Sequence, residues 1–401
     1  MKYLQTEFLR ISIIIILVCL TRGSLTAQIL SPDSKISLIT VGPGDELYSG
    51  FGHSAFWVYD PKLGMDRIYN YGTFDFNEDF YFKFISGKLD YLLSVSDLNN
   101  LGSNAQEEGR YMLEQELNLN QEMKEKLFLF LEHNYLPENR VYRYDFFYDN
   151  CSSRLRDALK FTLKDDLKYD LSENLDLSFR QLIDQFLLDK EVQDFGMDIG
   201  LGAPADVKAT PLQYMFLPEY LKKGFDKAQV NIGGTWKPLV TKTTMLIPAK
   251  RELKIPFFSP LVIMSIVLLI IGYFTWRNFK YGIGTLFWDA LFLAIAGLLG
   301  CLLIFLWFFT DHRVTSNNWD LLWAMPFHLI VLFLFKNKKF ATVLQYYFFV
   351  YGLLCFLLFI FSPILPEELN KAVLPLLIII ALRSMYLHRY FRKKAIATNI
   401  T

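Results

Sequence analysis

Cys151 stands in the polar segment 144–157, YDFFYDNCSSRLRD, and it is the only cysteine outside an apolar run. No second thiol in a polar segment is present to form a disulfide with it. If a helix begins at Cys151, the positive end of its dipole and its free N–H groups lower the thiol pKa and can receive a developing oxyanion. These features predict a cysteine nucleophile.

His53 is the residue that could accept the thiol proton. It leads the segment 53–59 and follows the glycines of the run GFGH, which keep backbone crowding low. A base of this kind needs a third polar group to orient the imidazole, and Asn70 on the following predicted strand is our choice. Three alternatives stay open from the sequence: Tyr71, Asp66 and Ser49.

The plainer interpretation of Cys151 and His53 is packing. A lone exported cysteine is often a buried small hydrophobe, and a lone strand histidine is usually a satisfied core residue. Asn150 and Ser152 make the surroundings of the cysteine polar, however, and the two residues together favour catalysis. No metal and no cofactor are predicted, because the five histidines are scattered and none share metal-ligand spacing on a helix.

A second polar constellation, TDHRVTSNNWD at residues 310–320, separates two apolar stretches. Its side chains, among them His312 and Asn318, are dense in hydrogen-bond donors and acceptors, and they are predicted to face the same compartment as Cys151. We expect this loop to bind lipid head groups or substrate. The alternative is a solvated loop with an interfacial tryptophan as anchor.

The elements that must position these residues form one soluble domain, residues 28–221. Period-two patterns and turn residues predict strands over 36–41, 53–59 and 66–71. Apolar spacing predicts helices over 107–116 and 121–134, and a further helix begins at Cys151 with Asp149 or Asn150 as its cap. Residues 222–254 have no clear period and are predicted to be a connector.

Both ends of the chain indicate export and membrane insertion. Residues 1–27 have the basic start, short apolar run and small residues of a signal peptide. Five apolar stretches lie in residues 255–401: 255–276, 286–310, 319–335, 340–361 and 372–387. A crossing helix needs about 20 residues, and the last stretch is interrupted by Pro375 and Arg383.

Charge decides the topology that these stretches predict. Five crossings put three basic segments in the cytoplasm, as the positive-inside rule requires: 277–280, 336–339 and 389–394. The expected protein is therefore a multi-pass protein of the inner membrane with its N-terminal domain in the periplasm. The 41 basic and 41 acidic residues balance, so no basic surface for nucleic acid is implied.

The order of a Phe-Gly-His-Ser strand and a later Asn-Cys-Ser-Ser helix start resembles the circularly permuted NlpC/P60-like cysteine enzymes. The whole chain more closely resembles the Lnb-type lipoprotein N-acyltransferases. These have a signal peptide, a periplasmic cysteine domain and five spans with a His-x-x-Thr-x-x-Asn loop, here His312, Thr315 and Asn318. The resemblance implies an α+β papain-like, permuted NlpC/P60-like domain followed by an all-α transmembrane domain of five helices.

By position, the resemblance also implies Cys151 as nucleophile and His53 as base. Asn70 remains our choice for the third catalytic residue, and the candidate substrate-binding residues are Asn150, Tyr144, His312 and Asn318. The implied reaction moves an acyl chain from a membrane phospholipid, through a cysteine thioester, to the α-amine of a diacylated lipoprotein.

Two other functions compete with acyl transfer. A membrane-anchored NlpC/P60-like cysteine peptidase or amidase of the cell wall would use the same Cys151 and His53, but it needs only one anchor. A non-catalytic membrane assembly or sensing protein would use both residues for packing alone. Substituting Cys151 separates this last reading from the two enzymes.

Overall fold

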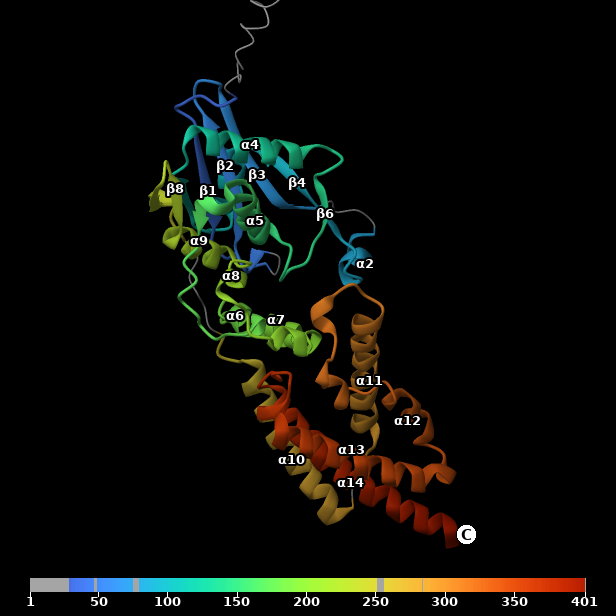
Figure 1. Ribbon diagram of the computed structural model, residues 1–401. Helices are drawn as coiled ribbons and strands as arrows, with labels where there is room; N and C mark the ends of the chain where they lie inside the picture. The colour runs from blue at the N-terminus through green and yellow to red at the C-terminus, as the bar shows by residue number, and fades with distance from the viewer. Residues whose placement is uncertain (1–28, 47–48, 75–78, 251–255, 283, 401) are drawn as a thin grey trace, which may run out of the picture.

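The computed structural model describes residues 29–46, 49–74, 79–250, 256–282 and 284–400. A sheet-rich α/β domain comes first and a helical membrane domain follows (Figure 1). This arrangement confirms the prediction that an α+β domain is followed by an all-helical domain. The predicted signal peptide lies outside the described residues.

A seven-stranded antiparallel sheet forms the centre of the first domain. Its strand order is β10-β5-β1-β2-β3-β4-β6. The strands are β1 (Lys35–Val41), β2 (His53–Asp60), β3 (Met65–Thr73), β4 (Asp90–Ser96), β5 (Met112–Leu117), β6 (Val141–Arg143) and β10 (Val240–Ile247). The three strands predicted from period-two patterns are confirmed as β1, β2 and β3.

Helices cover both faces of the sheet. On one face, α4 (Gln121–Tyr135), α5 (Cys151–Leu163) and α9 (Pro218–Lys227) pack against the strands around Phe56 and Tyr69. On the other face, α3 (Leu98–Glu107) covers β1 and β2. Each fully buried leucine of this core stabilises the fold by about 2 kcal/mol relative to exposure.

Two elements of the soluble domain differ from the sequence prediction. The helix expected over 107–116 is wrong, because α3 ends at Glu107, Gly109 adopts a positive φ of 66°, and β5 begins at Met112. Its glutamates favour helix locally, but pairing with β1 and β10 overrides that preference. Glu114 accepts hydrogen bonds from Ser37 Oγ (2.7 Å) and Lys35 Nζ (2.8 Å).

Much of the predicted connector is also strand. The segment forms β8 (Gln229–Ile232), β9 (Thr235–Pro238) and β10. β8 and β9 form a small sheet with β7 (Leu167–Lys168), and β10 is the edge strand beside β5. Residues 229–247 therefore belong to the soluble fold, because their backbone groups pair with strands that lie far away in the sequence.

A layer of short helices lies between the sheet and the membrane domain (Figure 1). It contains α6 (Phe179–Asp184), α7 (Glu191–Gly200), the 3-10 turn η3 (Ala203–Asp206) and α8 (Pro211–Tyr214). The guanidinium of Arg180, which is 1% exposed, holds this layer together by hydrogen bonds to Asp198, Asp206 and the carbonyl oxygen of Leu201. A buried arginine with this many acceptors stays charged and rigid.

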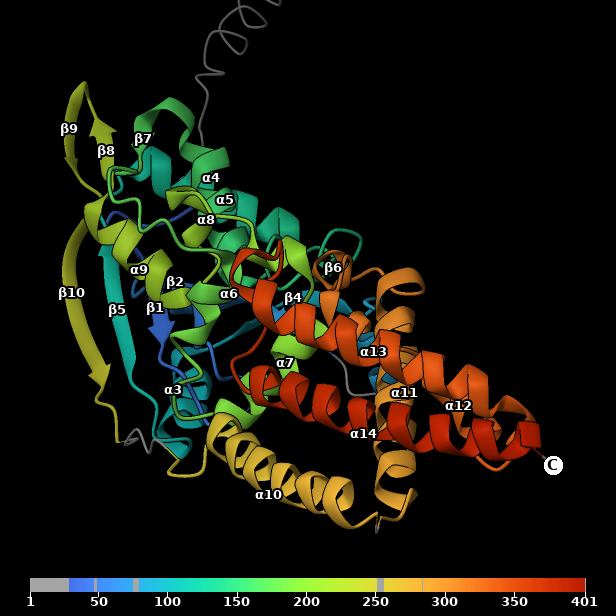
Figure 2. The same cartoon turned by 90° about the horizontal axis from the view of Figure 1, so that it is seen from below.

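In the part of the chain that the structure describes, four helices are long and apolar enough to cross a membrane. They are α10 (Pro260–Tyr281), α11 (Phe287–Phe308), α13 (Ala341–Phe361) and α14 (Val373–Ile400), and α10, α14 and α13 lie side by side in Figure 2. Pro375 falls in the first turn of α14, where proline is tolerated. Arg383 forms a two-pronged ion pair with Asp289 of α11 (2.8 and 2.6 Å), which satisfies its charge inside the bundle.

The third predicted span, 319–335, does not form a helix of crossing length. It contains the 3-10 turn η5 (Trp319–Leu322) and the short helix α12 (His328–Leu334). Pro326 lies between them, where it lacks an N–H and disfavours helix at the residue before it. The prediction relied on length and hydropathy and gave this proline no weight.

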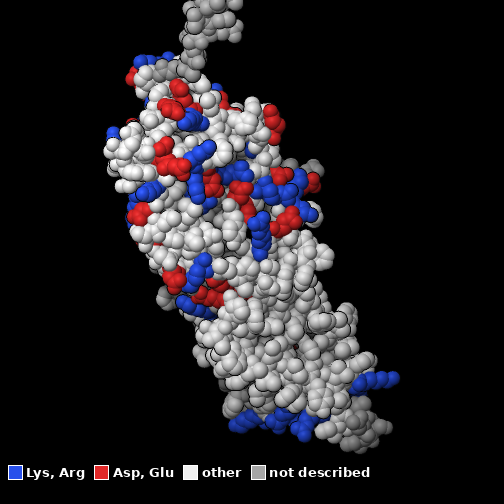
Figure 3. Space-filling model, in the orientation of Figure 1, with Lys and Arg blue, Asp and Glu red and all other residues white. Residues whose placement is uncertain are grey.

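Charge is distributed unevenly along the molecule. Figure 3 shows charged side chains over the soluble domain, a broad uncharged band on the visible face of the membrane domain, and Lys and Arg at its far end. Such a band fits hydrocarbon, and the basic end fits the cytoplasmic side of a membrane.

Candidate active site

Cys151 is the first residue of α5, as the sequence predicted, and of the two predicted caps, Asp149 and Asn150, Asn150 is the N-cap. The Asn150 Oδ1 atom accepts hydrogen bonds from the backbone N–H groups of Ser152 and Ser153, both at 2.9 Å. Ser153 Oγ in turn accepts from the N–H of Asn150 (2.8 Å). This reciprocal cap fixes the start of the helix and therefore the place of the thiol.

The remaining hydrogen-bonding capacity of Asn150 is also used. Its Nδ2 donates to the carbonyl oxygens of Phe146 (2.7 Å) and Phe216 (2.8 Å). An asparagine side chain has two donors and two acceptor sites, and all four are now occupied. Asn150, predicted as a substrate contact, is thus engaged in holding the turn that presents Cys151.

His53 is the first residue of β2 and lies beside Cys151. Ser152 Oγ donates to Ser54 Oγ (3.2 Å), which joins the start of α5 to the start of β2. Burial raises the pKa of the Cys151 thiol. The charge of His53, a hydrogen bond with His53 and a hydrogen bond from the Ser54 backbone N–H lower this pKa by more than burial raises it. The net pKa of the thiol is below the ordinary value for cysteine, which is the direction of shift that a nucleophilic thiol needs.

Gly72 makes room for the imidazole. The β2–β3 register pairs Phe56 with Tyr69, so Gly72 lies opposite His53 where the two strands continue. A Cβ atom on Gly72 would lie 2.6 Å from His53 Cε1 and 3.2 Å from Asn70 Oδ1. Sequence reasoning missed Gly72, although a glycine inside a strand pattern signals close approach of another group.

The candidates for the third residue are all engaged elsewhere. Asn70 Oδ1 accepts from the N–H of Gly72 (2.7 Å), and Asp66, opposite Tyr59, accepts from Trp57 Nε1 (2.7 Å). Ser49 Oγ donates to the carbonyl of Glu46 (3.3 Å).

The fourth candidate, Tyr71, contributes its carbonyl oxygen as acceptor for the hydroxyl of Tyr142. Within the described residues, no hydrogen bond joins any of the four to His53, and His53 Nε2 is buried without a partner. Asn70 Oδ1 and the imidazole of His53 both lie against Gly72.

Aromatic rings surround the thiol. Tyr144 stacks on Tyr91 of β4, with ring centroids 4.0 Å apart and planes at 18°, and both rings pack in the cluster that contains Cys151. Burial and the neighbouring Cys151 raise the pKa of Tyr91 to about 12, and burial, Tyr91 and Cys151 raise that of Tyr144. Both hydroxyls stay protonated and can donate hydrogen bonds. The sequence predicted Tyr144 here but gave no signal for Tyr91.

The outer loop of the membrane domain lies next to the segment that leads into α5. Arg143 Nη1 is 3.2 Å from Asp311 Oδ2, and Arg313 Nε is 4.0 Å from Asp145 Oδ2. Exposed pairs like these add little stability. These pairs show where the loop lies. Residues 143 and 145 flank Tyr144, so the loop is placed beside the candidate site.

The polar residues of this loop bond to backbone carbonyls. His312 Nε2 donates to the Phe84 oxygen (3.0 Å), Thr315 Oγ1 donates to the Leu306 oxygen (2.9 Å), and Asn318 Nδ2 donates to the Ile199 oxygen (2.7 Å). Because a carbonyl oxygen can only accept a hydrogen bond, His312 is assigned a proton on Nε2. The Thr315 contact holds the loop on α11, whereas the contacts of His312 and Asn318 tie the two domains together. His312 and Asn318, predicted as substrate contacts, thus form part of an inter-domain joint.

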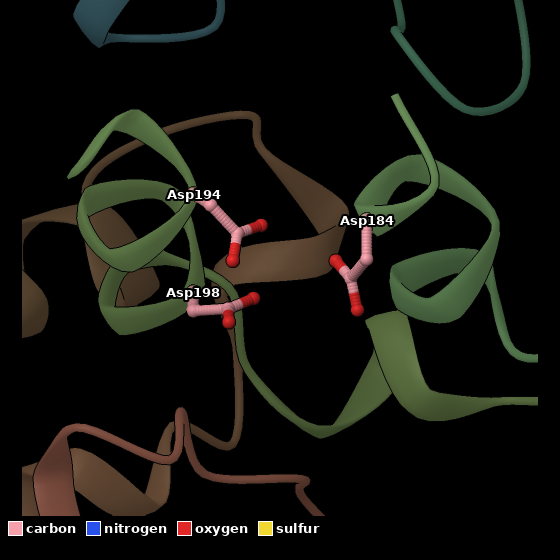
Figure 4. A group of neighbouring side chains, drawn as sticks. All are labelled: Asp184, Asp194 and Asp198. Atoms are coloured by element: carbon pink, nitrogen blue, oxygen red, sulfur yellow. The ribbon is translucent and has the colours of Figure 1, made fainter. Parts of the chain in front are cut away.

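Three carboxylates gather in the layer above the membrane domain: Asp184 from α6, and Asp194 and Asp198 from α7 (Figure 4). One oxygen of each lies within 4.8 Å of the others. Asp198 accepts from Arg180 Nη1 (2.6 Å) and Asn370 Nδ2 (2.8 Å), whereas the Oδ1 atoms of Asp184 and Asp194 are buried without a partner. Oxygen donors of this kind suit a hard cation, but they equally suit protons.

Protonation explains how the cluster tolerates burial. Burial, then repulsion by Asp198 and Asp194, raise the pKa of Asp184 to about 8. Burial and Asp198 raise the pKa of Asp194 to about 7, against the opposing effect of Arg180. Protons on these two carboxyls remove much of the repulsion near neutral pH.

We therefore expect the folded protein to lose stability as pH rises. A carboxyl whose folded pKa exceeds its unfolded value stabilises fully below the unfolded pKa, near 4, and this contribution is lost as pH passes the folded pKa. For Asp184 and Asp194 this loss of stability takes place between about pH 4 and about pH 8. Asp184→Asn should raise the Tm of the detergent-solubilised full chain at pH 8 by a few degrees and flatten the decline from pH 5 to pH 8.

The matched control is Asp165→Asn, an exposed aspartate of η2 (Lys164–Asp166). It should leave the pH profile of Tm unchanged. If Asp184→Asn lowers Tm equally at pH 5 and pH 8, the raised pKa of the cluster is not the source of the pH dependence.

Two family models match the chain. The model described as the Lnb N-terminal periplasmic domain matches residues 24–185, and the model described as the Lnb transmembrane domain matches residues 251–395. No curated protein and no solved structure matches it.

Proposed function

The chain belongs to the Lnb-type family, and from this membership we propose that it is a lipoprotein N-acyltransferase. It would move an acyl chain from a membrane phospholipid, through a thioester on Cys151, to the α-amine of the N-terminal diacylglyceryl-cysteine of lipoproteins. One observation carries the proposal: the outer loop of the membrane domain touches the residues on both sides of Tyr144, beside the thiol. A nucleophile in that position can reach an ester bond of a membrane lipid more readily than it can reach a bond of the cell wall.

In the first step, the Cys151 thiolate attacks the ester carbonyl carbon of the phospholipid. His53 holds the thiol proton as imidazolium and gives it to the departing lysophospholipid alkoxide, so a thioester forms and charge balances. Cys151 lies at the first turn of α5, the positive end of the helix dipole, which would stabilise the developing oxyanion. The protonated hydroxyls of Tyr91 and Tyr144 are further donors near the thiol.

In the second step, the neutral α-amine of the lipoprotein attacks the thioester carbonyl. His53 now accepts a proton from the attacking nitrogen, the carbon–sulfur bond breaks, and Cys151 leaves as thiolate. The products are an N-acylated lipoprotein and the free enzyme. The lowering of the thiol pKa assists both steps, because it makes the thiolate more available as nucleophile and a better leaving group.

The proposed topology keeps five crossings of the inner membrane. Residues 319–335 lead the chain from the outer loop towards the basic turn 336–339 (Figure 1). Non-helical backbone is tolerated at membrane depth where protein covers it, and here the carbonyl oxygen of Trp323 accepts from Tyr351 Oη (2.7 Å) and His328 Nε2 (2.9 Å). The soluble domain would lie in the periplasm after removal of residues 1–27, and the C-terminus in the cytoplasm.

The test is expression of the chain in cells that lack lipoprotein N-acylation. Mass analysis of lipoprotein N-terminal peptides should show the gain of one acyl chain, and a Cys151→Ala variant of equal abundance should show none. Unchanged lipoproteins together with altered cell-wall peptides would refute the proposal and support the cysteine peptidase or amidase. If neither the lipoproteins nor the cell wall change, the acyltransferase proposal is refuted and the non-catalytic assembly protein is the function that remains.

A further inference from the structure

The short helix α2 (Phe80–Ile85) exposes apolar side chains in an unusual concentration. Phe82 is 70% exposed, Phe84 is 49% exposed and Ile85 is 44% exposed. Single apolar residues on a surface need no explanation, but several in one turn indicate an interaction surface. Lys83 and Lys88 accompany them in the sequence, so the helix combines apolar rings with positive charge.

Contacts hold α2 against the loop that follows the outer end of α11 (Figure 1). His312 Nε2 donates to the Phe84 carbonyl oxygen (3.0 Å), and the N–H of Asp311 donates to the Ser86 oxygen (3.0 Å). The last turn of α11 continues the apolar surface, since Phe308 is 64% exposed and Phe309 follows at 67%. The exposed apolar residues of α2 are therefore tied to the loop that begins directly after exposed rings at the end of a helix of membrane-spanning length.

The same helix connects two strands of the candidate active site. β3 ends at Thr73, one residue after Gly72, which lies beside His53, and β4 begins at Asp90, one residue before Tyr91, so α2 stands in the connection between the two strands. Phe74 packs on Tyr91 with ring centroids 5.1 Å apart, and Tyr91 stacks on Tyr144 next to Cys151. A row of aromatic rings thus extends to the thiol from Phe74, which follows β3 in the sequence and precedes α2.

We propose that α2 lies in the outer leaflet of the membrane and admits the phospholipid acyl donor to Cys151 along these rings. The inference rests on the proposed function and adds to it the route and the surface that take up the donor. Phenylalanine rings suit the boundary between head groups and acyl chains, and lysines attract lipid phosphates. The occupant is lipid rather than a protein partner, because the contacts with Asp311 and His312 hold α2 beside the point where α11 leaves the membrane.

The first experiment uses a photo-crosslinking amino acid, p-benzoylphenylalanine, in place of Phe82. The full chain is reconstituted into vesicles of phosphatidylethanolamine and phosphatidylglycerol, irradiated, and analysed by mass spectrometry for covalent phospholipid. The matched control replaces Phe161, an equally aromatic residue that is 64% exposed near the far end of α5. Burial of a phenylalanine ring in lipid predicts about tenfold more lipid adduct at position 82 than at 161. Equal yields at the two positions, or an adduct to protein alone, would overturn the proposal.

The second experiment measures donor access. In the Phe82→Ser/Phe84→Ser double variant, thioester formation on Cys151 is followed with vesicle phospholipid and with a water-soluble short-chain activated ester. The ratio of the vesicle rate to the soluble-ester rate should fall about tenfold, whereas Phe161→Ser should leave it unchanged. An unchanged ratio in the double variant contradicts the role of α2.

The two readouts separate this proposal from the proposed function. Lipid crosslinking at position 82 does not require acyl transfer. If the unaltered chain forms no thioester from vesicles but crosslinks at position 82, the acyltransferase proposal fails and the membrane contact of α2 stands. If the thioester forms normally and position 82 yields no lipid adduct, only the role of α2 fails.

Discussion

Cys151→Ala should reduce lipoprotein N-acylation at least about 10⁴-fold, to the level of cells without the enzyme, because no other group at the site can form the thioester. Cys151→Ser should do nearly the same, since a serine hydroxyl is not ionised by a neighbouring histidine to the extent that a thiol is. The measurement is the acyl mass on lipoprotein N-terminal peptides, with enzyme abundance in the membrane checked in parallel. A hydroxylamine-labile acyl group on the native protein, missing from Cys151→Ala, would identify the intermediate directly.

Cys301→Ala is the matched control, because Cys301 is an exposed thiol of the membrane helix α11. It should leave acylation at the native level. Substantial acylation by Cys151→Ala would refute the thioester mechanism, whatever the behaviour of the control.

His53→Ala should lower acylation by about 10²–10⁴-fold, because the thiol and the attacking amine both lose their proton acceptor. Gly72→Ala should also impair catalysis strongly, although this variant retains the His53 side chain. The added Cβ would lie 2.6 Å from His53 Cε1, so the imidazole must turn or the strands must separate. Both variants are assayed for thioester formation and for transfer to the lipoprotein.

The control for Gly72→Ala is Gly196→Ala in α7, where an added Cβ meets no atom within 4 Å. It should be active and slightly more stable, as alanine in a helix usually is. Added imidazole should restore part of the activity of His53→Ala. Full activity of Gly72→Ala would mean that the orientation of His53 seen here is not the one used in catalysis.

The parts of the site that could be predicted from sequence are those with local causes. The start of α5 follows from Asn150, whose cap depends on the next three residues alone, and β2 follows from its alternating pattern after Gly52, which has a positive φ of 85°. Two short motifs far apart in the chain were then enough to propose Cys151 and His53 as a pair, and the structure places these side chains together.

The parts that could not be predicted depend on contacts between distant segments. β5 reads as helix because its glutamates and leucines favour helix, and only its neighbours β1 and β10 make it a strand. Tyr91 gives no local sign that it will stack on Tyr144. Asn70 Oδ1 accepts from the N–H of Gly72, a bond to a neighbour two residues along the same strand that the strand pattern did not reveal.

The edge strand β10 has a consequence for how the protein is made. β10 pairs with β5, and only residues 248–259 separate β10 from the membrane helix α10. During synthesis the edge of β5 stays open until the chain has been translocated past residue 247, which is close to the moment when α10 enters the membrane. Open strand edges invite aggregation, so completion of the periplasmic sheet and insertion of the first membrane helix become nearly one event. A periplasmic fragment cut at residue 221 would lack this strand, and exchange of membrane domains between relatives should join the chains after residue 247.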